Sequence, residues 1–134
     1  MEKGKNLLYW AARLIAAVIM VQTLYYKFTA SEESVYIFTT VGMEPWGRIG
    51  VGVLELIASV LILLNATAWL GAALALGLMA GAIVMHTTLL GIEIKGDGGQ
   101  LFIYAIIVAL ASVVILVFNK HNITELLKKI LKKA

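Results

Sequence analysis

The chain has 134 residues and a formal net charge of +3, and 61% of its residues are hydrophobic while 14% are charged. Together with a mean hydropathy of +0.93, this balance excludes an ordinary soluble domain and predicts an integral membrane protein whose main partner is the lipid bilayer. The absence of cysteine excludes disulfides, thiol relays and cysteine-ligated metals, and we expect no nucleic-acid partner.

The first apolar stretch covers about residues 7–27, within the ~17–25 residues that a membrane-spanning helix needs. Lys3 and Lys5 precede it, as in a secretory signal, but its apolar run exceeds a signal's ~7–15 residues and no A-x-A-like cleavage site follows. We therefore expect a retained transmembrane helix. Arg13 and Lys27 fall on about one stripe of this helix, and that stripe should face other helices rather than lipid.

The loop over residues 28–45 should contain a short helix of its own. Ser31 can cap the start of this helix, with Glu32 and Glu33 in its first turn, and Pro45 lies beyond its end. We expect the segment to lie along the outer membrane interface as a lid.

Three further apolar stretches predict transmembrane helices over about residues 46–64, 66–90 and 101–118. The first two are joined so tightly that they must be antiparallel neighbours. A glycine-rich turn over residues 91–99 connects the last two. Residues 122–133 repeat apolar side chains at helical spacing opposite several lysines, which predicts a cytoplasmic amphipathic helix on anionic lipid.

Lysines and glutamates are distributed unequally between the two sides of the predicted bundle. Lys3 and Lys5 precede the first helix and five lysines follow the fourth, whereas the loop over residues 28–45 has three glutamates and no Lys or Arg. The positive-inside rule then predicts that both termini are cytoplasmic. We expect one all-α domain over residues 1–134, an up-down antiparallel bundle of four transmembrane helices in a prokaryotic cytoplasmic membrane.

A ridge of small residues, formed by Ala73, Gly77 and Gly81, runs along the third transmembrane helix. Such ridges let helix backbones approach closely. We interpret this one as close packing within the bundle rather than as a dimer interface.

Five ionisable residues lie within or at the edges of the apolar stretches. A charge in hydrocarbon costs at least ~2.5 kcal/mol, so each needs a partner, a route to the interface or a function. Counting ~1.5 Å per residue from the outer helix ends places Glu55 roughly 13 Å deep and Arg13 roughly 20 Å deep, with Lys27 at the boundary. If their helix faces converge, these side chains form a polar column that binds a ligand or relays protons. The candidates are Arg13, Lys27, Arg48, Glu55 and His86, with Gln22, Gln100 and Tyr104 as further members.

A purely structural role is the alternative for each of these residues. Arg13 and Glu55 differ in depth by only ~7 Å, so they can form a buried ion pair that holds two helices in register. Lys27 and Arg48 can extend to lipid headgroups. His86 can simply form a hydrogen bond between helices rather than carry protons, and since no second histidine lies near it in the sequence, we expect no metal site.

Several short motifs occur in a characteristic order. They are an early Arg in the first helix, Y-Y-K-F ending at Phe28, V-G-M-E-P ending at Pro45, G-x-x-E ending at Glu55, and a Met that precedes His86. In this order the motifs resemble those of the DoxX family of small four-helix membrane proteins. The resemblance implies a four-helix bundle and kinship with the DoxD-type subunit of thiosulfate:quinone oxidoreductase and with MauE-type proteins of methylamine utilisation. It implies no particular activity, and the chain lacks the cysteines that a MauE-like role would use.

We therefore hypothesise a ligand-binding or accessory component of a membrane redox system, with an outward-facing charged pocket for a quinone or a small anion. Arg13 and Lys27 would stabilise negative charge, while Glu55 and His86 would relay protons. Two alternatives stay open: a non-catalytic subunit that docks a membrane or extracytoplasmic redox protein, and a small anion transporter. The sequence shows no cofactor motif and no inverted repeat, and it fixes neither catalytic residues nor oligomeric state.

Overall fold

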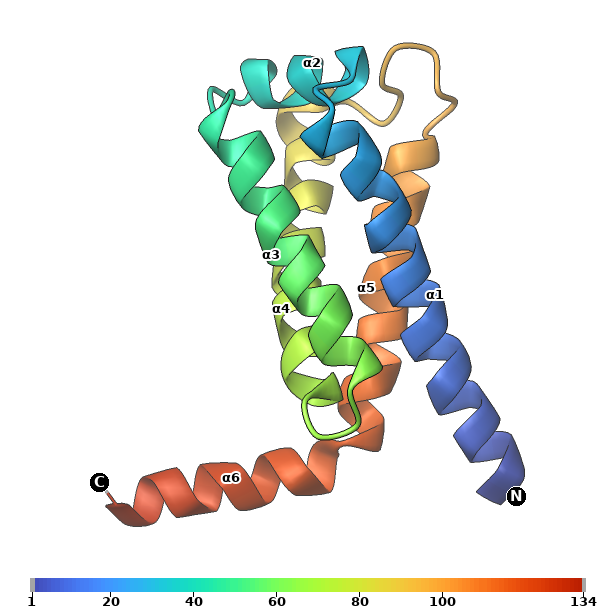
Figure 1. The fold of residues 1–134 in the computed structure, drawn as a ribbon, viewed down its shortest axis with the longest axis vertical. Coiled ribbons are helices and arrows are strands. Elements are labelled where there is room, and N and C mark those ends of the chain that lie inside the picture. The colour runs from blue at the N-terminus through green and yellow to red at the C-terminus, as the bar shows by residue number, and fades with distance from the viewer. Residues whose placement is uncertain (1, 134) are drawn as a thin grey trace.

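The computed structural model describes residues 2–133, which form helices and no strands (Figure 1). Four helical stretches are long and apolar enough to cross a membrane, namely Gly4–Phe28, Trp46–Leu63, Ala68–Leu90 and Gln100–Phe118. The predicted all-α membrane fold is thus confirmed. The elements are α1 (Glu2–Phe28), α2 (Glu32–Thr40), α3 (Trp46–Leu63), α4 (Ala68–Met85), the π-helix η1 (His86–Leu90), α5 (Gln100–Phe118) and α6 (Lys120–Lys133).

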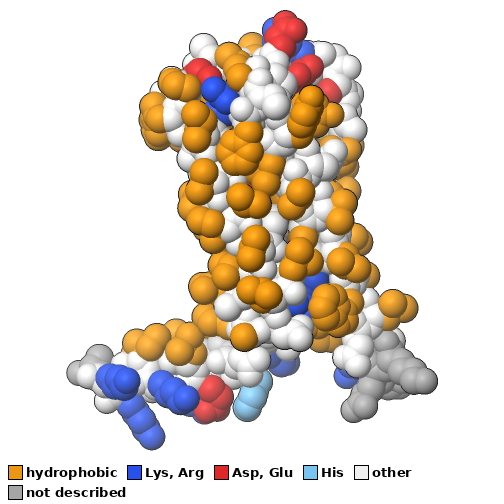
Figure 2. All heavy atoms as spheres, in the orientation of Figure 1, with side chains coloured by type: hydrophobic (Ala, Val, Ile, Leu, Met, Phe, Trp, Pro, Cys, Tyr) orange, Lys and Arg blue, Asp and Glu red, His pale blue; other side chains and the backbone are white. Residues whose placement is uncertain are grey.

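The four long helices form an up-down bundle in which α1 and α4 each pack against both α3 and α5. The chain reverses direction between α1 and α3, between α3 and α4, and between η1 and α5, so neighbouring helices are antiparallel (Figure 1). Helix α2 lies across one end of the bundle, and both termini lie at the opposite end (Figure 1). Large apolar side chains cover the outside of the bundle between these two ends (Figure 2), as expected where lipid replaces water as solvent.

Small side chains allow the helices to approach one another closely. Ala16, Ala58 and Ala72 are fully enclosed in the core. Gly71 lies directly against α3, and a Cβ atom there would come within 2.7 Å of the Ala58 carbonyl oxygen. Only glycine fits at this contact, because the obstructing atoms belong to the α3 backbone.

The predicted ridge on α4 does not make such a contact, so our interpretation of it as close packing is wrong. Ala73, Gly77 and Gly81 are exposed, and a Cβ atom added to either glycine would meet nothing within 4 Å. The close backbone contact between α3 and α4 lies instead at Gly71, on another side of the α4 helix. Spacing along one helix identifies a small-residue stripe, but it does not tell which stripe meets a neighbour.

The expected lid helix forms at the end of the bundle away from the termini. Ser31 is its N-cap, and the Ser34 amide donates to the Ser31 hydroxyl oxygen at 3.3 Å. Phe38 is buried beneath the helix. On the outer side, Lys95 lies 3.6 Å from the Glu32 carboxylate, which links the lid to the loop between η1 and α5.

One helix boundary and one helix conformation differ from those expected. The first helix begins at Glu2 rather than near residue 7, because a helix can continue into the aqueous phase after its apolar stretch ends. The third transmembrane helix changes from α to π at His86 and ends before Gly91, whose φ of 81° reverses the chain. Insertions of π-helix are rare and often occur at functional sites.

The orientation of the bundle is testable in a chain without native cysteine. We predict that Glu32→Cys, on the lid, reacts with a membrane-impermeant thiol reagent in intact cells, because the lysine distribution predicts that the lid lies on the outer side of the membrane. His121→Cys, at the terminal end, should react only after the cells are opened. The reverse labelling pattern would overturn the predicted cytoplasmic location of both termini.

Candidate functional site

The ionisable residues of the membrane region fall into separate groups rather than into one column. Lys27, Glu55 and His86 line a common cavity in the half of the bundle beneath α2. Arg48 lies at the junction of α1, α3 and the loop before α3. Arg13 lies near the opposite end of the bundle, beside the turn between α3 and α4.

An ion pair between Lys27 and Glu55 joins α1 to α3. The Lys27 Nζ atom lies 3.0 Å from Glu55 Oε1, and the Glu55 side chain is only 3% exposed. The Thr23 hydroxyl lies 2.8 Å from the Met20 carbonyl oxygen and 3.3 Å from Glu55 Oε2. A hydroxyl has one proton to donate, so the closer carbonyl takes it and Glu55 Oε2 keeps spare capacity as an acceptor.

The cavity beside this ion pair has a volume of about 460 Å³. Its walls come from all four spanning helices and from the buried side of the lid, and they are mainly apolar. The three polar residues that the sequence suggested as further members all line it. The polar lining besides Lys27, Glu55 and His86 includes Gln22, Thr23, Ser34, Asp97, Gln100 and Tyr104.

His86 is the first residue of η1 and is buried against the cavity. Its Nδ1 atom lies 2.9 Å from the Gly91 carbonyl oxygen. A carbonyl only accepts hydrogen bonds, so Nδ1 carries the proton and Nε2 is the acceptor of the neutral ring. The ring also packs edge to face on Phe102, with 5.5 Å between centroids. The π-helical end of the third spanning helix therefore holds the imidazole in one tautomer and one orientation.

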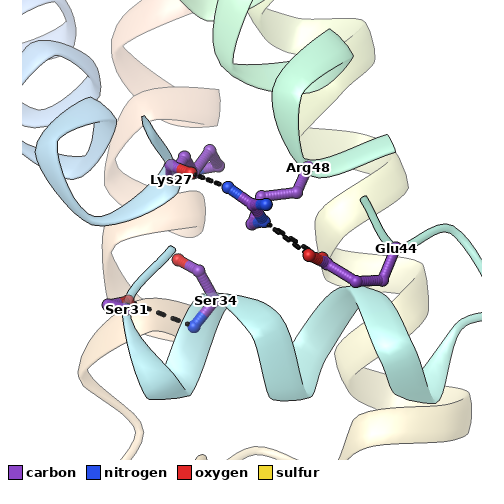
Figure 3. A network of polar contacts seen from close by, with 5 residues as sticks. All are labelled: Lys27, Ser31, Ser34, Glu44 and Arg48. Atoms are coloured by element: carbon purple, nitrogen blue, oxygen red, sulfur yellow. Dashed lines mark hydrogen bonds and ion pairs between the residues drawn. The ribbon is translucent and has the colours of Figure 1, made fainter. Parts of the chain in front are cut away.

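Arg48 does not line the cavity. Its polar contacts join the backbone at the end of α1 to the loop before α3 (Figure 3). Its Nε donates to the Glu44 carboxylate at 2.9 Å, and its Nη1 donates to the Lys27 carbonyl oxygen. That carbonyl belongs to the last turn of α1, where carbonyls lack partners within the helix. Arg48 therefore caps the C-terminal end of α1, and its side chain does not lie among the candidate residues that line the cavity.

The prediction of an ion pair between Arg13 and Glu55 is wrong, because each side chain has other partners. Arg13 Nε donates to the Ile62 carbonyl oxygen at 2.8 Å, and Nη1 donates to Asn65 Oδ1 at 3.0 Å. The guanidinium also stacks over the Trp10 ring at 3.8 Å from its centroid. Arg13 lies beside the end of α3, where carbonyls lack partners within the helix. Glu55 lies about 10 Å away along that helix and is paired with Lys27 instead.

Several polar residues of the lining, among them Thr23, Ser34 and Asp97, were not predicted from the sequence. Thr23 precedes Lys27 by one helical turn and so shares its face of the helix. This spacing could have predicted Thr23 as a member of the site. Asp97 was visible only as a charge in a glycine-rich turn. Its carboxylate accepts hydrogen bonds from the amides of Ile94 at 2.9 Å, Gly99 at 2.8 Å and Leu101 at 3.3 Å.

The environment of Asp97 favours its ionised form. Burial alone would raise the pKa, but the three backbone amide donors lower it, as does the charge of His86 when its ring is protonated, so the pKa lies below the ordinary value of 3.8. The ionised side chain therefore holds the loop that begins α5 and lines the cavity.

A double-mutant cycle tests the ion pair between Lys27 and Glu55. We expect Lys27→Met to destabilise the fold by about 3 kcal/mol, because it leaves a buried carboxylate unpaired. Glu55→Gln should cost less, since Lys27 is partly exposed, and the double variant should cost less than the sum of the two. Unfolding in detergent measures all three changes. Arg13→Met combined with Glu55→Gln is the matched control and should be additive; additivity for Lys27 with Glu55 would disprove the pair.

The pH dependence of stability tests the role of Asp97. Its folded-state pKa is lowered, so its contribution is fully present above its unfolded-state pKa of about 3.9 and is lost as the pH falls through the folded-state value. Asp97→Asn should therefore lower the melting temperature at neutral pH, and the deficit should shrink below about pH 4. Glu32→Gln, at an exposed site, should show no comparable trend. A deficit that stays constant down to strong acid would contradict this role.

The model of the DoxX family matches residues 8–88, a segment that runs from α1 into η1 and contains Arg13, Lys27, Arg48, Glu55 and His86. The chain matches no curated protein and no solved structure. The family match covers more than half of the chain and agrees with its four candidate membrane-spanning helices, and the chain therefore belongs to the DoxX family.

Proposed function

We propose that the outer cavity binds an uncharged, membrane-soluble ligand of the quinone class, and that the protein is a ligand-binding or accessory component of a membrane redox system. The observation that carries this proposal is the ion pair of Lys27 and Glu55 in the wall of a cavity of about 460 Å³ within the spanning region. Cavities of roughly this size, with apolar walls and a few convergent polar groups, are typical of small-molecule sites.

The balance of charges argues for a neutral ligand. Lys27 is paired with Glu55, and Arg48 is paired with Glu44 outside the cavity. The lining also includes the carboxylates of Glu33 and Asp97. Among the described residues, the acidic side chains of the lining therefore outnumber its lysine and arginine side chains. A small anion would meet net negative charge there, which disfavours both the anion-binding form of the hypothesis and the anion transporter.

The position of the cavity argues for a ligand that comes from the bilayer. Gln22, Gly77 and Gly81 line it and are also exposed within membrane-spanning helices. The space beyond both glycines is open. A polar side chain such as Gln22 is unusual at a lipid-facing position, but it suits a place where a hydrogen-bonding headgroup leaves the bilayer.

The polar groups in the lining suit the two oxygens of a quinone or quinol. Glu55 Oε2 and the Nε2 atom of neutral His86 can accept hydrogen bonds, whereas Lys27 and Gln100 can donate them. A quinone, when bound, supplies two-electron and two-proton chemistry. Glu55 and His86 are the residues that would take up or release the protons, and the electrons would come from a partner redox protein in the membrane or at its outer face.

A matched pair of glycine substitutions tests the proposal. Gly77→Leu places a large side chain into the cavity, whereas Gly50→Leu places the same side chain at an exposed helical position that does not line it. We expect Gly77→Leu to weaken binding of a decyl-chain benzoquinone at least tenfold, an effect of about 1.4 kcal/mol, and Gly50→Leu to leave it unchanged. Bound quinone per mole of protein is measured by solvent extraction and chromatography after reconstitution.

Two results would contradict the proposed function. One is equal quinone binding by both leucine variants while circular dichroism shows that both remain helical. The other is stabilisation by inorganic sulfate that disappears in Lys27→Met, since this would show that the cavity holds an anion despite its carboxylates.

A further inference from the structure

The C-terminal helix α6 presents a surface that no other part of the described chain covers. None of the residues Lys120–Lys133 is buried. The helix leaves the end of the bundle and runs sideways from it (Figure 1). Four of its five large apolar side chains are exposed, namely Leu126, Leu127, Ile130 and Leu131, and the fifth, Ile123, is partly buried.

The two faces of α6 point in opposite directions. In Figure 2 the apolar side chains lie on the side of α6 that faces the level of the spanning helices, and the charged side chains lie on the far side. The helix contains five lysines and a single acidic residue, Glu125. Glu125 lies 3.9 Å from Lys128, so most of the lysine charge has no partner within this helix.

The direction in which α6 leaves the bundle is held by contacts at its start. Asn119, between α5 and α6, uses one amide nitrogen to donate to the Tyr9 hydroxyl and to the Ile115 carbonyl, each at 2.9 Å. Tyr9 in turn packs against Phe118, with 5.4 Å between ring centroids. The bend is therefore attached to α1 as well as to α5, which favours a defined orientation of α6 over a freely moving tail.

We infer that α6 docks on a bilayer surface of anionic phospholipid, with its apolar face at the boundary of headgroups and acyl chains and its lysines among the phosphates. An amphipathic helix with lysines opposite its apolar stripe matches such a surface in both hydrophobicity and charge. The spanning helices hold α6 at the level of this interface. Docking of a second copy through the polar face would bring lysines against lysines, which charge repulsion disfavours.

The full chain in lipid nanodiscs provides the test, because a single cysteine can be labelled in a chain that has none. An environment-sensitive nitrobenzoxadiazole label is placed at Leu127→Cys on the apolar face and, as the matched control, at His121→Cys on the polar face. In nanodiscs of equimolar phosphatidylglycerol and phosphatidylcholine we expect several-fold protection of the Leu127 label from acrylamide quenching, and little at His121.

Lipid charge and protein charge are then varied separately. Protection at Leu127 should decrease in pure phosphatidylcholine, in high salt, and when Lys128, Lys129, Lys132 and Lys133 are all changed to Gln with helicity retained. Two results would overturn the inference. One is equal quenching of the labels at the two positions, and the other is protection at Leu127 that is the same in anionic and in pure phosphatidylcholine nanodiscs. Protection that requires several protein copies in one disc would assign the surface to self-association instead. Because the cavity lies at the other end of the bundle, quinone binding and this result can fail independently.

Discussion

Neutralisation of charge inside the bilayer is the constraint on which the rest of the site depends. A buried carboxylate in hydrocarbon must be paired, hydrated or protonated, and Glu55 meets this requirement through Lys27 at 3.0 Å. The pair is placed beside a cavity rather than inside a packed core. A cavity wall lets one carboxylate oxygen remain available while the other is compensated. The proposed binding site requires this combination, whereas a purely structural ion pair does not.

The fold was predictable from the sequence to a large extent, because bilayer thickness sets helix length and charge placement marks helix ends. Four spanning helices, the Ser31 cap and the lid all agree with that reading. The partner of Glu55 was not predictable in the same way. Depth counted along the helix axes placed Arg13 closer to Glu55 than Lys27. Such counting ignores helix rotation and tilt, and in the structure it is Lys27 that meets Glu55.

The sequence was a weaker guide to the cavity than to the polar residues around it. Empty space arises where side chains fail to fill the gap between helices, and this depends on all neighbours at once. The sequence pattern predicted that Gly77 and Gly81 pack against a neighbouring helix, but both adjoin open space. Gly71 makes the tight backbone contact instead. His86 was visible as a buried polar residue, yet its tautomer follows from the π-helical end that brings the Gly91 carbonyl to Nδ1.

Lys27 is held at both of its ends by α3, and this has a mechanical consequence. Glu55 binds its ammonium group, while Arg48, two turns away on the same helix, binds its carbonyl oxygen. A shift of α1 along α3 by one turn, about 5.4 Å, would break both attachments together. The two helices are thus fastened against sliding beside the cavity, so the motion that these contacts allow between α1 and α3 is tilting rather than translation along the helix axes.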